Sequence, residues 1–150
     1  MVSADRQVRS TCPYCGVGCQ IDLHIRDGVI LKTTAPFEAA PNFGMLCVKG
    51  RFGTDYTTHP GRLRKPLIRA NSDEPRSHPP VWREASWDEA LDLVAARLTE
   101  IVQVHGPDSV AAFACAKATN EDNYLLQKLT RAVLGTNNVD HCSRLCHAGR

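Results

Sequence analysis

The sequence predicts a mixed fold of class α+β / α/β, with a small β-rich domain over residues 1–65 followed by the start of an α/β domain over residues 66–150. Residues 20–31 alternate apolar and polar side chains around an Asp-Gly pair, which is typical of a β-hairpin. After residue 86 the apolar side chains instead recur at helical spacing and then form a short apolar run. Helices that alternate with short apolar strands indicate an α/β layer, which we expect to be incomplete within residues 66–150.

Four cysteines of the first domain divide into three close residues and one distant residue. Cys12, Cys15 and Cys19 lie in C-P-Y-C-G-V-G-C, and Cys47 follows in L-C-V-K-G. Proline and glycine residues around both segments predict loops that can wrap closely around a metal centre. Four soft thiolate ligands in this division favour a [4Fe–4S] cluster. Zinc is the main alternative, although its sites usually take paired ligands from each arm. A disulfide framework is less favoured, because seven cysteines are an odd number.

The hairpin is the main structural element expected in the first domain. Ile21, Leu23 and Ile25 share one face of its first strand, and Asp27-Gly28 supplies the turn. A domain with so small an apolar core is expected to depend on its metal centre for stability.

The second domain begins after a polar, proline-bearing loop at residues 71–80. Ser86 is the expected N-cap of its first helix, with Glu89 as the partner in a capping box, and the helix ends before Gly106. The elements expected next are a buried parallel strand over 110–114, a second helix that starts at Thr119 and ends before Gly135, and a strand near 138–140. Cys115 is expected to be a buried core thiol.

Composition excludes several classes of partner. Charged residues make up 23% of the chain and the formal net charge is +2, which predicts no nucleic-acid partner. No apolar run approaches the roughly 18 residues of a membrane span. The first ten residues have neither an apolar signal region nor an arginine pair, and together with free thiols this predicts a cytoplasmic location.

Seven segments carry a resemblance to a known family. They are T-C-P-Y-C-G-V-G-C at 11–19, G-M-L-C-V-K-G-R-F-G at 44–53, H-P-x-R-L-x-x-P-L-I-R at 59–69, W-D-E-A-L at 87–91, T-N-E-D-N-Y at 119–124, L-G-T-N-N-V-D at 134–140 and C-S-R-L-C-H at 142–147. Together they resemble the N-terminal part of the molybdopterin oxidoreductases, and within them the formate dehydrogenase α subunit. The resemblance implies one [4Fe–4S] cluster in the first domain and a molybdenum or tungsten ion held by two molybdopterin guanine dinucleotides in the second.

The resemblance also implies roles for individual residues. The four cysteines of the first domain match the cluster ligands, and Lys49 matches a lysine that lies between the cluster and one pterin. Its ammonium group would stabilise the reduced, more negative cluster, whereas the alternative is a solvated surface lysine. Cys146 matches the cysteine or selenocysteine bound to molybdenum or tungsten, and His147 matches the histidine of the formate-oxidising members. A thiolate suits such a metal, and an imidazole can take up a proton near neutral pH. The alternative is a buried cysteine beside a surface histidine, which would be preferred without the surrounding S-R-L and N-N-V-D segments.

Other polar residues of the second domain have two readings each. Arg144 could attract an anion to the metal site or form a surface salt bridge, and Cys142 is taken as structural. Thr119, Asn120 and Asn123 open the second helix, where capping is favoured over contact with cofactor phosphates.

The activity that the resemblance implies is oxidation of formate to carbon dioxide by a catalytic subunit, with electrons passing through the cluster to a redox partner subunit or carrier. One alternative is a relative of assimilatory nitrate reductase, whose family typically has methionine and asparagine where His147 and Cys142 stand here. A second alternative is a truncated, stand-alone [4Fe–4S] electron-transfer protein. Most cofactor contacts of the family lie beyond the segment matched here, so this chain alone is expected to be inactive.

Overall fold

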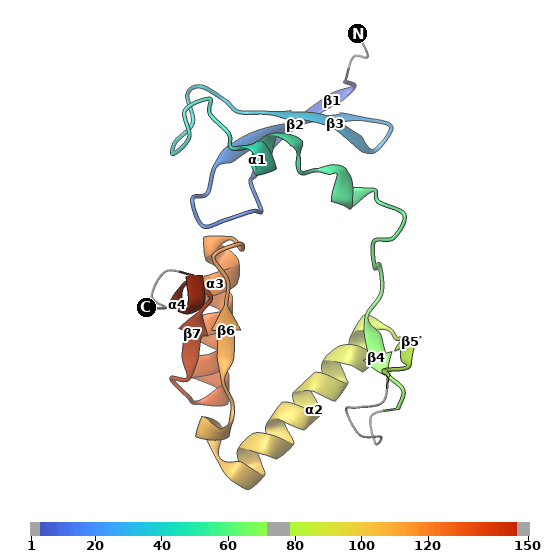
Figure 1. The fold of residues 1–150 in the computed structure, drawn as a ribbon, viewed down its shortest axis with the longest axis vertical. Helices are drawn as coiled ribbons and strands as arrows, with labels where there is room; N and C mark the ends of the chain where they lie inside the picture. The colour runs from blue at the N-terminus through green and yellow to red at the C-terminus, as the bar shows by residue number, and fades with distance from the viewer. Residues whose placement is uncertain (1–3, 72–78, 147–150) are drawn as a thin grey trace.

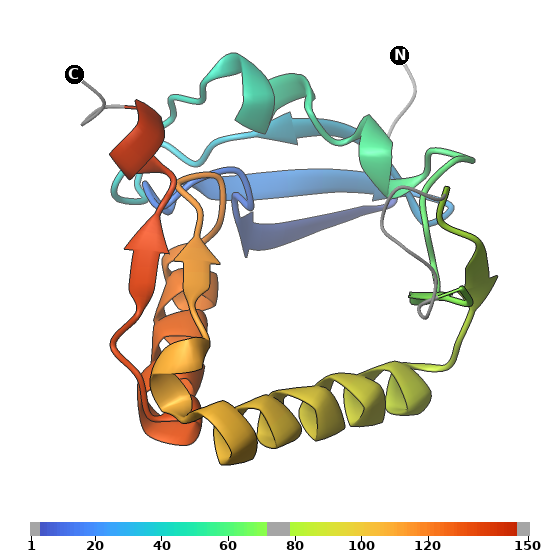
Figure 2. The same ribbon diagram turned by 60° about the horizontal axis from the view of Figure 1, so that its bottom comes forward.

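The computed structural model describes residues 4–71 and 79–146, which form an open frame (Figures 1 and 2). In Figure 2 the N-terminal β-sheet unit forms the upper side of this frame and a long helix forms the lower side. The C-terminal unit of helix and strands forms a third side, between them. The accessible surface is 11268 Å². A compact monomer of the same mass would expose about 7,500 Å². The chain therefore leaves much of its apolar surface uncovered.

The first unit is a three-stranded antiparallel sheet in the order β1-β2-β3. Its strands are β1 (Arg6–Thr11), β2 (Gln20–Arg26) and β3 (Val29–Thr34). The predicted hairpin is confirmed as β2 and β3, and its turn residues Asp27 and Gly28 have φ values of 49° and 77°. Both values are positive, as the favoured two-residue hairpin turn requires. Strand β1 was not predicted, because Val8 is its single strongly apolar residue and gives no alternating pattern.

Two short helices lie against this sheet (Figure 1). They are α1 (Val48–Phe52) and the 3₁₀ turn η1 (Asp55–Thr57). Thr33 of β3 anchors α1, because its buried hydroxyl lies 2.9 Å from the carbonyl oxygen of Gly50 and 2.6 Å from that of Arg51. Thr33 is 3% exposed, so this polar group is both buried and satisfied.

The second unit starts with a short ladder and one long helix. The ladder pairs β4 (Leu67–Arg69) with β5 (Trp82–Glu84), and α2 (Trp87–His105) follows it. The N-cap predicted at Ser86 is confirmed, since its hydroxyl accepts a hydrogen bond of 3.1 Å from the Glu89 backbone amide. The ladder was not predicted, because strands of three residues carry too little pattern to detect. Most of the predicted 71–80 loop, residues 72–78, lies outside the described residues.

The remaining elements follow the predicted order of strand, helix and strand. After the 3₁₀ turn η2 (Pro107–Ser109) they are β6 (Ala112–Ala114), α3 (Asn120–Lys128), its π-helical continuation η3 (Leu129–Leu134), β7 (Val139–His141) and α4 (Ser143–Cys146). Strands β6 and β7 are parallel, as predicted. Gly135 ends the helix with a left-handed φ of 79°, which a glycine adopts without strain.

Two burial predictions for this region are wrong. The strand is three residues long rather than five, and its Phe113 side chain is 77% exposed because it lies on the uncovered face. Cys115 is exposed rather than buried. The reason is that β6 ends at Ala114, so Cys115 begins the exposed turn that leads to α3.

Candidate metal centre

The two cysteine arms of the first unit meet at the edge of the sheet. Cys12, Cys15 and Cys19 lie on the cysteine loop (residues 12–19) between β1 and β2, and a 2.8 Å hydrogen bond from the Cys12 amide to the Cys19 carbonyl closes this loop. Cys47 is the N-cap of α1. A Cβ atom added to Gly50 of α1 would lie 3.4 Å from the Cys12 sulfur. The helix that begins after Cys47 therefore packs directly against the first cysteine of the loop.

The Asn42 side chain braces the two arms. Its Oδ1 accepts a 2.8 Å hydrogen bond from the Gln20 amide, one residue past the cysteine loop. Its Nδ2 donates to the carbonyl oxygens of Gln20 at 3.1 Å and of Met45 at 2.9 Å, two residues before Cys47. Asn42 is 8% exposed. Sequence reasoning missed it, because a buried asparagine has the same local sequence as an asparagine in a solvated loop.

The pKa of the Cys19 thiol responds to the three other cysteines of the candidate site. Burial raises the pKa of the Cys19 thiol, and the charges of Cys12, Cys15 and Cys47 raise it further. Repulsion of this kind between thiolates is relieved when they bind positively charged iron. The set of donors therefore fits the group that the sequence predicts.

Cys47 differs from Cys19 because the start of α1 stabilises its thiolate. Hydrogen bonds from the backbone amides of Gly50 and then Lys49 lower the pKa of the Cys47 thiol, and the Lys49 charge lowers it further. Cys47 is exposed. Its lowered pKa favours the thiolate, which is the form that binds metal.

Within residues 4–71 and 79–146, no three cysteine, histidine or carboxylate side chains lie close enough together to form a single-ion site. The preference for a cluster over zinc therefore still rests on the three-and-one division of the four cysteines along the sequence.

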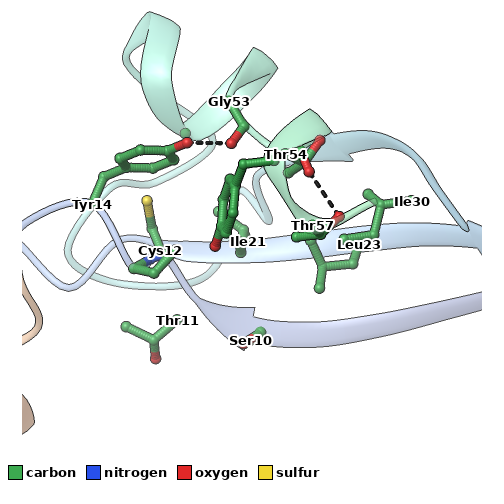
Figure 3. Close-up of a pocket in the computed structure, with 13 residues that line it drawn as sticks. Ser10, Thr11, Cys12, Tyr14, Ile21, Leu23, Ile30, Gly53, Thr54 and Thr57 are labelled. Atoms are coloured by element: carbon green, nitrogen blue, oxygen red, sulfur yellow. Dashed lines mark hydrogen bonds between the residues drawn. The ribbon is translucent and has the colours of Figure 1, made fainter. Parts of the chain in front are cut away.

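Figure 3 shows a hollow behind Cys12, between the sheet and the α1–η1 segment. Its volume is about 220 Å³, and Ile21, Leu23 and Ile30 give it an apolar floor. Tyr14 borders it and donates a hydrogen bond to the Gly53 carbonyl (Figure 3). Cys12 is the one candidate ligand among its lining residues, so the hollow lies beside the candidate metal centre and does not contain it.

The predicted second-domain site is described in part. Cys146 is the last residue of α4, and His147 lies outside the described residues, so both roles stay predictions. Arg144 pairs with Asp140 at 3.4 Å, which matches the salt-bridge reading. The Cys142 sulfur accepts a 3.1 Å hydrogen bond from the Ala116 amide, in keeping with a structural role. Thr119 caps α3, as predicted, and it does so in a capping box with Asp122.

Comparison with known proteins assigns the class of protein. Residues 5–59 match the molybdopterin oxidoreductase Fe4S4 domain, and residues 62–150 match the molybdopterin oxidoreductase family. The chain belongs to the molybdopterin oxidoreductase family. This membership confirms the predicted fold class and supports an iron–sulfur cluster and a molybdopterin as cofactors.

Individual relatives are similar over most of this chain. A probable oxidoreductase, YjgC, of Bacillus subtilis is 46% identical over 143 residues, which are 95% of this chain and 14% of that protein. The F420-dependent formate dehydrogenase 2 subunit alpha of Methanococcus maripaludis is 46% identical over 142 residues, 94% of this chain and 19% of that protein. Among solved structures, acetylene hydratase from Pelobacter acetylenicus matches with a TM-score of 0.67 and 26% identity, over 92% of this chain and 19% of that one. The chain thus spans 14% to 19% of these relatives.

Among the described residues, no helix is long and apolar enough to cross a membrane.

Proposed function

We propose that this chain is the N-terminal portion of a formate dehydrogenase catalytic subunit, with a [4Fe–4S] cluster bound by Cys12, Cys15, Cys19 and Cys47. The observation that carries the proposal is the meeting of the two cysteine arms, with Asn42 bridging them and the Cys19 pKa responding to the three other thiols. The formate dehydrogenase name of the Methanococcus relative supports formate as the substrate.

The intact enzyme would use two centres. When bound, the cluster supplies one-electron transfer, and a molybdenum or tungsten ion with two molybdopterin guanine dinucleotides supplies the two-electron oxidation of formate to carbon dioxide. The electrons leave to a redox partner subunit or carrier.

The residues of this chain have separate tasks in that scheme. Lys49 places a positive charge next to the Cys47 thiolate, which favours the more negative state of the site. Cys146 supplies a soft sulfur ligand for molybdenum or tungsten, and His147 holds the proton released from formate.

The first experiment is anaerobic reconstitution of the chain with iron and sulfide, followed by EPR of the dithionite-reduced protein. We expect about four irons per chain and a fast-relaxing signal near g of about 1.9 to 2.05. Cys47→Ser should lose most of the iron, because it removes one of four ligands. Cys115→Ser is the matched control and should retain the iron, since Cys115 is an exposed thiol outside both arms. Tight binding of one zinc with no EPR signal would overturn the cluster assignment.

The second experiment tests the substrate. This chain is grafted in place of the matching segment of the Methanococcus formate dehydrogenase subunit, to which it is 46% identical. We expect formate to reduce the cluster of the hybrid. Cys146→Ser in the hybrid should abolish formate oxidation while the cluster signal stays. A hybrid that reduces nitrate and ignores formate would support the nitrate reductase alternative instead.

A further inference from the structure

The cysteine loop meets the start of α3, although the two segments are far apart in the sequence. Figures 1 and 2 both show this loop facing one end of α3. The Asn120 side chain donates a hydrogen bond of 2.8 Å from Nδ2 to the carbonyl oxygen of Gly16, across 104 sequence positions. Gly16 lies between the candidate ligands Cys15 and Cys19. The bond therefore ties the first unit to the second at the metal centre.

A side chain at position 16 would crowd the contact. A Cβ atom there would lie 2.7 Å from Asn120 Oδ1, which is closer than real Cβ contacts allow. Because Oδ1 is the end of a flexible side chain, the Asn120 amide would turn aside, and this movement disturbs its hydrogen bond to the Gly16 carbonyl oxygen. Gly16 and Asn120 thus form a matched pair.

Asn120 is presented by a braced helix end. Thr119 and Asp122 form a capping box, in which the Asp122 amide donates to the Thr119 hydroxyl and the Asp122 carboxylate accepts from the Thr119 amide. Asn123 then fastens the helix to the turn after β6, because its side chain accepts from the Cys115 amide at 3.2 Å and donates to the Cys115 carbonyl at 3.1 Å. Asn120 stands on this fixed helix end, so its side chain can hold the cysteine loop in place.

We propose that Asn120 is a positioning residue for the iron–sulfur site, a role that rests on the proposed cluster function. The Gly16 carbonyl points toward α3, so the Val17 N–H of the same planar peptide points away from α3. In the proposed role, this amide, held in one direction between two candidate ligands, donates a hydrogen bond to the cluster. Hydrogen bonds to the sulfurs of such clusters are among the determinants of their reduction potential.

The test compares Asn120→Ala with the unmodified chain after both are reconstituted with iron and sulfide. We expect the variant to bind its cluster with a reduction potential shifted to a more negative value in an EPR-monitored redox titration. Hydrogen exchange of the amides of residues 14–18 should become about threefold to tenfold faster, as expected when one hydrogen bond is removed. Asn137→Ala is the matched control, since its exposed side chain makes no hydrogen bond to a described residue.

A double substitution separates the proposed contact from a general loss of stability. Gly16→Ala should shift the potential in the same direction as Asn120→Ala, and the two changes together should shift it no further than either one alone. Additive shifts, or an unchanged potential and unchanged exchange in Asn120→Ala, would overturn the positioning role and leave the proposed function standing. Failure of the unmodified chain to bind a cluster overturns the proposed function itself, and with it the role of Asn120 at the cluster.

Discussion

Replacement of Asn42 by alanine is expected to loosen the brace between the two cysteine arms. The change removes three hydrogen bonds of 2.8, 3.1 and 2.9 Å and leaves the polar backbone groups of Gln20 and Met45 without these partners. Each such bond contributes about 0.5–1.5 kcal/mol net. Three bonds at a site that is 8% exposed therefore predict a loss of about 2–4 kcal/mol in the free energy of unfolding.

The assay is anaerobic guanidinium unfolding of the reconstituted chain, followed by circular dichroism and by the visible absorbance of the cluster. Asn42→Asp places a carboxylate oxygen where Nδ2 now donates to the carbonyl oxygens of Gln20 and Met45, so at neutral pH it should be at least as destabilising as Asn42→Ala. Asn137→Ala should change stability by less than about 0.5 kcal/mol, as surface substitutions do. An Asn42→Ala chain as stable as this control, with a full cluster, would show that the brace does not hold the arms.

Three further predictions concern the frame around the site. The Arg9 side chain donates a 3.0 Å hydrogen bond to the Asp22 carboxylate and lowers the pKa of that carboxyl group. The stability that this pair adds is therefore present above the pKa of Asp22 in the unfolded chain and is lost as the pH falls through its folded value. Asp22→Asn should lack that acid-dependent loss, and an acid unfolding profile identical to that of the unmodified chain would count against the pair. Thr33→Val should cost about 1–3 kcal/mol in chemical unfolding, because two α1 carbonyls lose their buried donor; a neutral result would mean that α1 is held by other contacts. Ser86→Ala should cost about 1 kcal/mol of α2 stability through loss of the cap, measured by thermal unfolding, whereas Ser86→Gly should cost only a few tenths.

Local signals explain the elements that the sequence predicted correctly. The Asp27-Gly28 turn, the Ser86 cap and the glycine that ends η3 each depend on the conformational preferences of one or two residues. Such preferences act within a few positions, so the residue types alone reveal them. The strands β1, β4 and β5 were not predicted because they have no apolar pattern of their own. They are strands because their backbones pair with neighbouring strands.

Burial was the weakest part of the prediction. Apolar residues of α2 such as Trp87 and Val94 recur at helical spacing, yet they are 66% and 54% exposed. The periodicity correctly predicted the helix, but it carries no information on which surface covers the apolar face. The burial prediction for Cys115 was wrong for the same reason. Its neighbours in the sequence are apolar, but the residue lies at the start of an exposed turn.

The sequence by itself determined the candidate ligands and the family, because ligand chemistry follows from residue type and spacing along a short segment. Only the tertiary structure decided how the site is held together. Asn42 reaches back 22 positions to Gln20, and Asn120 reaches 104 positions to Gly16. These bonds exist because the fold brings distant backbone groups within 3 Å of a side-chain amide, and no local preference of asparagine specifies which backbone groups those will be.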